Sequence, residues 1–177
     1  DLEMTYSQMG LVMGSWQLTY IGAALIVGFL IDRWGIRNAL FSGAALMALS
    51  AGLRGFSGGF WSLLFPVALF GIGGPMISAG APKTIALWFH GKARGTAVGI
   101  YMTGPWIGGS FALAATNHWV MPIAGQSWRT TFFIYGMMAL AIGFLWLFLA
   151  RNFEDGGSSG GPGMRQVFMA LVKVPNV

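Results

Sequence analysis

Five long apolar runs constrain this chain more than any other feature of its sequence. They lie at about residues 9–31, 38–56, 60–81, 96–115 and 131–150. A helix needs about 20 apolar residues to cross about 30 Å of hydrocarbon, and each run is close to that length. Only 8% of the 177 residues are charged, whereas about a quarter are charged in a soluble domain. The sequence therefore predicts an all-α, polytopic helical bundle embedded in a lipid bilayer.

Glycine and cysteine usage agree with a membrane bundle and exclude some kinds of site. The chain has 28 glycines, and small residues let membrane helices approach closely. It has no cysteine, which excludes a disulfide framework and thiolate metal sites. The two histidines, His90 and His118, are predicted to lie at opposite faces of the membrane, so they cannot share a metal. We expect neither a metal nor a cofactor.

The basic residues predict the orientation, because short cytoplasmic loops are enriched in Lys and Arg. If the loop around residue 33 is cytoplasmic, eight basic residues lie inside: Arg33, Arg37, Lys83, Lys92, Arg94, Arg151, Arg165 and Lys173. Only Arg54, predicted to snorkel to the headgroups, and Arg129 then lie outside. The net charge of +5 is thus explained without nucleic acid, and no polar face interleaves basic and aromatic residues as a nucleic-acid groove would. We expect a multi-pass protein of the cytoplasmic membrane.

The chain divides into two parts. Residues 1–151 form the predicted transmembrane bundle, and residues 152–177 form a cytoplasmic linker rich in glycine and serine. Within the linker, the spacing of apolar residues predicts a short amphipathic helix over about 164–174. Neither end carries a signal or a terminating feature, so we expect an internal piece of a longer protein.

One loop carries charges where membrane-spanning chains rarely keep any. Gly28, Asp32, Arg33, Gly35 and Arg37 lie between the first two apolar runs. An ordinary cytoplasmic loop would account for the arginines and glycines, but not for the acid. Because an uncompensated carboxylate near hydrocarbon costs a few kcal/mol, Asp32 is expected to be paired, and Arg33 and Arg37 are the candidate partners.

The loop resembles the signature loop of the major facilitator superfamily of transporters, G-x-L-x-D-R-x-G-R-R-x-x-L. The matching residues are Gly28, Leu30, Asp32, Arg33, Gly35, Arg37 and Leu40, with Ile36 in place of one basic residue. The resemblance implies a cytoplasmic gate, in which Asp32 engages the N-terminal end of a helix in the other half of the transporter. A carboxylate at a helix N-terminus is worth about 0.3 to 2 kcal/mol. The chain would then correspond to helices two to six of twelve plus the start of the central linker, with helix one and the C-terminal half as missing partners.

Two further glycine motifs support the resemblance. Gly104, Pro105, Gly108 and Gly109 resemble the G-P-x-x-G-G motif associated with antiporters, although Ile100 stands where the family has another glycine. Proline removes a backbone donor and glycines remove side chains, so this segment is expected to bend and to pack closely. An ordinary proline kink is the alternative.

The third motif is a glycine-rich helix followed by a basic turn. Gly71, Gly73 and Arg94 match it, and Gly74 belongs to the same glycine-rich helix, but Val67 stands where the family places a membrane arginine linked to proton coupling. No ionisable residue remains inside the hydrocarbon part of the five runs, so no proton relay is evident in this chain.

Polar and aromatic residues within the apolar runs are candidates for a substrate cavity: Gln17, Tyr20, Ser78, Tyr101, Thr103 and Trp106. Each of them could instead satisfy a contact between helices. Lys83 is the cation that could reach an anionic substrate, with an interfacial snorkelling lysine as the alternative.

The resemblance implies secondary active transport of a small solute by alternating access, as a symporter or an antiporter. Similarity to carriers of small anions and organic acids favours a small organic or inorganic anion as substrate. A membrane-embedded enzyme is disfavoured, because the spans hold no catalytic triad, carboxylate pair or metal-ligand set. A non-transporting sensor or structural protein with the same fold is the remaining alternative.

Overall fold

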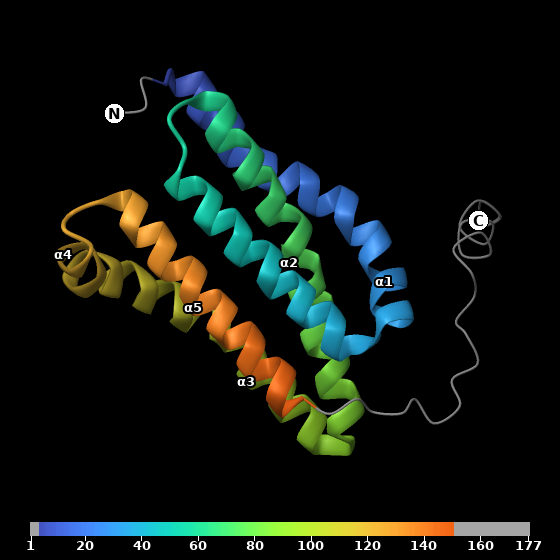
Figure 1. Ribbon diagram of the computed structural model, residues 1–177. Coiled ribbons are helices and arrows are strands. Elements are labelled where there is room, and N and C mark those ends of the chain that lie inside the picture. The colour runs from blue at the N-terminus through green and yellow to red at the C-terminus, as the bar shows by residue number, and fades with distance from the viewer. Residues whose placement is uncertain (1–3, 151–177) are drawn as a thin grey trace.

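The computed structural model describes residues 4–150, and these form a bundle of helices (Figure 1). In chain order the elements are α1 (Tyr6–Gly55), α2 (Phe60–Trp88), α3 (Gly91–Ala115), the π-helix η1 (Thr116–Val120), α4 (Met121–Ile123) and α5 (Trp128–Leu149). No strand occurs among the described residues, which confirms the all-α membrane bundle. The predicted linker at 152–177, with its amphipathic helix, lies outside the described residues.

Helix α1 consists of two segments that run in opposite directions (Figure 1). It begins at a capping box, in which the Thr5 amide donates to Gln8 Oε1 at 3.0 Å and the Gln8 amide donates to Thr5 Oγ1 at 3.3 Å. At Gly35 the backbone leaves the helix, with φ 76° and ψ 154°, and the chain reverses. The predicted loop between the first two runs is therefore a turn at one residue, which joins a first segment (6–34) to a second segment (36–55).

The glycine-rich part of α2 brings both segments of α1 into contact with it. A Cβ atom at Gly71 would lie 2.0 Å from Thr19 Oγ1 and 2.2 Å from the Trp16 carbonyl oxygen, on the first segment. A Cβ atom at Gly73 would lie 2.9 Å from the carbonyl oxygen of Gly43, on the second segment. Backbones approach this closely only where side chains are absent.

The turn at Gly35 rests on a small apolar core. Val27 and Ile31 of the first segment, Ala39 of the second segment and Met76 of α2 form a buried cluster. Because these apolar side chains pack together beneath the turn, the charged residues 32, 33 and 37 lie at the end of the bundle. The core thus fixes where the charges of the turn can lie.

Helix α2 contains three prolines and still runs for 29 residues. Pro66 has no amide hydrogen, so it cannot donate the helical hydrogen bond to the carbonyl oxygen of Ser62, four residues earlier. The Ser57 hydroxyl donates to that oxygen at 2.8 Å instead. Side-chain hydroxyls of this kind let proline persist within a membrane helix.

Several helix ends lie beyond the predicted apolar runs. Helix α2 continues to Trp88 and α3 begins at Gly91, so the predicted basic turn at 90–95 forms the start of a helix. The segment between the predicted runs at 96–115 and 131–150 is helical through Ile123. Helix formation does not require apolar residues, and it continues where the chain leaves the hydrocarbon. Among the described residues, α1, α2 and α5 are long and apolar enough to cross a membrane, and the five individual spans stay a prediction.

Candidate functional site

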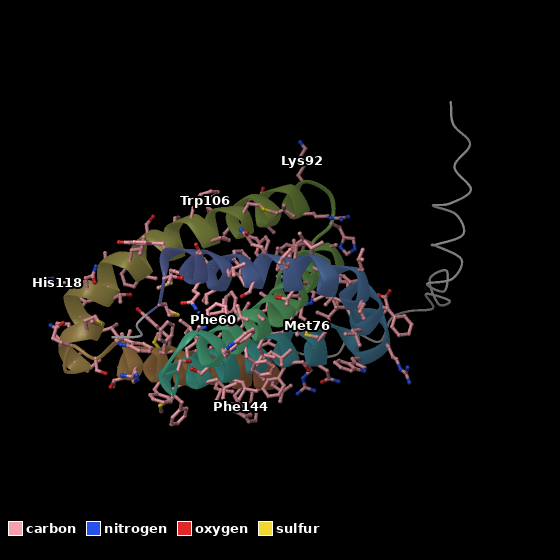
Figure 2. All side chains as sticks on the ribbon, turned by 90° about the horizontal axis from the view of Figure 1, so that it is seen from above. Phe60, Met76, Lys92, Trp106, His118 and Phe144 are labelled. Carbon is pink, nitrogen blue, oxygen red and sulfur yellow. The ribbon has the colours of Figure 1, made fainter. Side chains whose placement is uncertain are left out.

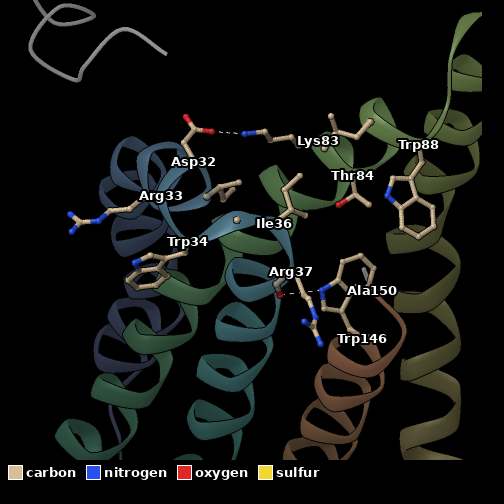
Figure 3. A pocket seen from close by; sticks show the side chains of 13 residues that line it. Asp32, Arg33, Trp34, Ile36, Arg37, Lys83, Thr84, Trp88, Trp146 and Ala150 are labelled. Atoms are coloured by element: carbon tan, nitrogen blue, oxygen red, sulfur yellow. Dashed lines mark hydrogen bonds and ion pairs between the residues drawn. The ribbon is translucent and has the colours of Figure 1, made fainter. Parts of the chain in front are cut away.

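The Gly35 turn, the end of α2 and the end of α5 meet at one end of the bundle and enclose a cavity of about 290 Å³ (Figure 3). Helix α1 contributes Ile31, Asp32, Arg33, Trp34, Gly35, Ile36 and Arg37; helix α2 contributes Lys83, Thr84, Leu87 and Trp88; the third group is Trp146 and Ala150. Four of these residues are charged, and all four belong to the predicted gate or to the end of α2.

Asp32 forms an ion pair with Lys83 of α2 (Figure 3). The expected pairing with Arg33 or Arg37 is therefore wrong. Adjacent residues of a helix do not face each other, which excludes Arg33, and Arg37 lies beyond the turn and faces α5. The side chains of Lys83 and Asp32 are 41% and 61% exposed. An ion pair this exposed contributes about 0.2 to 1 kcal/mol, so it is easily broken.

Arg37 connects the second segment of α1 to α5. Its Nε and Nη2 atoms donate to the carbonyl oxygen of Leu147 at 2.9 and 2.5 Å. That oxygen lies in the last turn of α5, where carbonyls have no partner within the helix. In return the Trp146 indole Nε1 donates to the Arg37 carbonyl oxygen at 3.2 Å. The two contacts fix the end of α5 against the start of the second segment.

The glycines of the three motifs have different surroundings. Gly35 supplies a positive φ at the turn, and Gly71, Gly73 and Gly74 lie in close contact with α1. No atom lies within 4 Å of a Cβ atom placed at the other motif glycines: Gly28, Gly104, Gly108 and Gly109. Helix α3, which has no buried residue, continues through Pro105. The bending and packing role of the Gly104 motif stays a prediction, as does a role for Arg94 beyond the start of α3.

Two of the predicted cavity residues come together. The hydroxyl oxygens of Tyr20, on α1, and Ser78, on α2, lie 2.6 Å apart. Gln17 is exposed one helical turn before Tyr20, on the same face of α1. By contrast, Thr103 donates to a carbonyl of its own helix, and Trp106 is 81% exposed and points away from the bundle (Figure 2).

A second cavity of about 350 Å³ lies beside the first, and it includes the sixth predicted residue, Tyr101. Its walls come from α1 (Leu40, Ala44), α2 (Ile77, Ala81, Thr84, Ile85), α3 (Tyr101) and α5 (Ile142, Gly143, Trp146). Almost all of these side chains are apolar. Thr84 and Trp146 line both cavities.

Arg54 lies in a position that the sequence did not predict. Its guanidinium lies over the ring of Phe70 at 5.1 Å and over the ring of Phe132 at 5.6 Å, and its Nε atom is buried without a hydrogen-bond partner. The predicted snorkelling to the headgroups is therefore wrong, because two aromatic rings offer a cation–π site between α2 and α5. Val67, at the position of the family's membrane arginine, lies in an apolar cluster with Val12 and Leu63.

Membrane-length apolar helices joined at a charged glycine turn define a polytopic helical membrane bundle. The family model for the Major Facilitator Superfamily matches residues 1–176. The chain belongs to this superfamily, which confirms the resemblance seen in the Asp32 turn.

Similar proteins are named as transporters. The chain is 29% identical to the hexuronate transporter of Bacillus subtilis (86% of this chain, 35% of the relative). It is 28% identical to the probable galactarate/D-glucarate transporter of Escherichia coli (83% and 33%). It is 33% identical to the 3-(3-hydroxy-phenyl)propionate transporter of Escherichia coli (76% and 32%). The chain thus spans about a third of the length of these relatives. The family consists of multi-pass membrane proteins, and these relatives are named as transporters and not as enzymes.

Proposed function

We propose that this chain is part of a secondary active transporter that carries a small organic acid anion across the cytoplasmic membrane. The observation that carries the proposal is the chemistry of the relatives' named substrates. Hexuronate, galactarate, D-glucarate and 3-(3-hydroxy-phenyl)propionate are all carboxylates. Carboxylic acids with pKa values near 4 are ionised at neutral pH, so the substrate is an anion. An inorganic anion is thereby disfavoured relative to the organic acids.

The proposed mechanism is alternating access, in which two helical bundles move against each other around a site near the middle of the membrane. The polar pair Tyr20 and Ser78, with Gln17 on the same face, supports a place for the substrate between α1 and α2. Their hydroxyl and amide groups are suited to hydroxyl-bearing acids such as hexuronates. Lys83, the candidate cation for an anionic substrate, is paired with Asp32 in this structure.

The Asp32 turn is the proposed cytoplasmic gate. Its carboxylate has a half-exposed partner, Lys83, worth about 0.2 to 1 kcal/mol. The N-terminus of a helix from the other half would offer the same carboxylate about 0.3 to 2 kcal/mol. The two energies are comparable, so Asp32 can exchange one partner for the other at little cost. Such a balance is what a gate that opens and closes in every transport cycle requires.

The direct test is uptake by the full-length protein in proteoliposomes. Radiolabelled glucuronate, glucarate and a phenylpropionate are offered one at a time, with liposomes lacking protein as the control. We expect saturable uptake of at least one acid, and inhibition by an excess of the same unlabelled acid. Uptake of none of them would overturn the proposal. Acid binding without uptake would favour the alternative, a sensor with the same fold.

A further inference from the structure

Two neighbouring cavities lie at the Gly35 end of the bundle, one with a charged lining and one with an apolar lining. They share the lining residues Thr84 and Trp146, and their volumes are about 290 and 350 Å³. The gate uses Asp32 and Lys83 at the rim of the first cavity. Nothing in the proposed transport mechanism uses the apolar cavity or its junction with the charged one.

The polarity of the space changes along the helices that line it. On α1, Arg37 lines the charged cavity, and Leu40 and Ala44, one and two turns further on, line the apolar one. On α2, Thr84 is at the junction, and Ile77 lies two turns before it in the apolar cavity. Residues at these spacings share one helix face. Each helix therefore leads from a polar mouth into an apolar interior.

Arg37 places a positive charge at the mouth, and no acid among residues 4–150 forms an ion pair with it. A guanidinium has five N–H donors, and the Leu147 carbonyl accepts from two of its nitrogen atoms, so donors remain for a ligand. Asp32 is the one acid among the lining residues, and it is paired with Lys83. Figure 3 shows Arg37 beside Trp146, whereas Arg33 points away from both. Guanidinium groups bind phosphates through paired hydrogen bonds.

Tryptophan at the mouth indicates the depth of the site in the membrane. Trp88 and Trp146 both line the charged cavity, and tryptophan is enriched where headgroups meet hydrocarbon. A ligand that suits this space has an anionic group at headgroup depth and a long apolar part that extends toward the membrane centre. A small soluble anion would fill only the mouth, and an uncharged apolar molecule would leave Arg37 without a partner.

We infer that this space binds an anionic phospholipid, with its phosphate at Arg37 and one acyl chain in the cavity lined by Leu40, Ala44, Ile77 and Ala81. The site lies between α1, α2, α3 and α5, so it does not depend on the identity of the transported acid. The bound lipid is drawn from the membrane leaflet that the charged cavity faces.

The test measures lipid binding to the full-length protein by native mass spectrometry. The detergent-purified, delipidated protein is titrated with phosphatidylglycerol and with phosphatidylcholine of the same acyl chains. Three variants are compared with the wild type: Arg37→Gln removes the charge, Arg37→Lys retains it, and Ala81→Phe fills the apolar cavity. Lys92→Gln is the matched control, because Lys92 is exposed at the start of α3, lines neither cavity and points away from the bundle (Figure 2).

We expect phosphatidylglycerol to bind more tightly than phosphatidylcholine. Arg37→Gln and Ala81→Phe should each weaken phosphatidylglycerol binding by about tenfold or more. The first variant loses a charge-assisted hydrogen bond to the phosphate, and the second fills the space of the acyl chain. Arg37→Lys should retain most of the binding, and Lys92→Gln all of it. Equal binding of both lipids, or wild-type binding by Arg37→Gln or Ala81→Phe, would overturn the inference. Displacement of the lipid by glycerol 3-phosphate alone would also overturn it, because that result would identify a site for a soluble anion. The absence of bound lipid, because other helices cover the cavity, would overturn it as well.

Discussion

Replacing Gly71 by alanine tests the contact on which the packing of α1 against α2 depends. The added Cβ would lie 2.0 Å from Thr19 Oγ1 and 2.2 Å from the Trp16 carbonyl oxygen. Ordinary van der Waals contacts are about 3.5 to 4 Å long, so the two helices must separate by more than an ångström. The backbone oxygen cannot rotate away as the end of a flexible side chain could. The separation would also break the 2.8 Å hydrogen bond from Thr19 Oγ1 to the Ala68 carbonyl oxygen.

The expected loss of stability follows from these two effects. Overpacking of a tight contact costs typically about 1 to 3 kcal/mol, and a hydrogen bond between membrane helices averages about 0.6 kcal/mol. Together they give about 2 to 4 kcal/mol. A shift of about 2 to 4 °C per kcal/mol is typical for chains of 150 to 250 residues, which corresponds to a fall in Tm on the order of 4 to 16 °C.

Gly104→Ala is the control, because it makes the same chemical change in a helix. No atom lies within 4 Å of a Cβ at Gly104, and alanine favours a helix over glycine by about 1 kcal/mol. Tm of the full-length protein in detergent is measured by tryptophan fluorescence. We expect Gly71→Ala to lower Tm and Gly104→Ala to leave it unchanged or to raise it. Equal Tm values for the two variants would refute the packing argument.

Three other substitutions test the turn. Asp32→Asn should slow initial uptake into proteoliposomes while lowering stability by less than about 1 kcal/mol, because the ion pair is half exposed; unchanged uptake would contradict the gate. Lys83→Gln should slow uptake in the same way, and Lys92→Gln should not. Equal uptake rates for these two variants would show that the ion pair has no part in gating. Gly35→Ala should lower the free energy of unfolding by about 1 to 3 kcal/mol, because φ 76° and ψ 154° are almost restricted to glycine; an unchanged Tm would contradict this strain.

The sequence predicted the elements well, because apolar length and turn chemistry are local properties. The five runs lie in helices apart from residues 56 and 150 at the ends of two of them, and the turn at Gly35 falls within the predicted loop. Helix ends were less predictable. Residues 117–123 are polar and aromatic, which favoured a loop, yet they continue the helix as η1 and α4. Hydropathy reports where a chain leaves the hydrocarbon and not where its hydrogen-bonded helix ends.

The contacts of the candidate site were harder to predict, because they depend on the rotation of one helix against another. Helix alternation placed Lys83 and Asp32 at the same membrane face, and that was the signal from which their ion pair could have been predicted. The position of Arg54 depends on Phe70 and Phe132, which come from two different helices. Its place near the end of an apolar run suggested snorkelling, and no local pattern predicts where two rings will converge.

Two contacts hold the charged turn, and their difference in strength assigns them different roles. Arg37 donates to the Leu147 carbonyl oxygen and accepts from the Trp146 indole Nε1 in partly buried surroundings, and hydrogen bonds from a charged donor contribute about 1.5 to 3 kcal/mol. The exposed Asp32–Lys83 pair contributes about 0.2 to 1 kcal/mol. In the proposed transport cycle, the weaker contact changes first. We therefore expect the Arg37 tie to keep the second segment and α5 together as one body, while Asp32 changes partners at its edge.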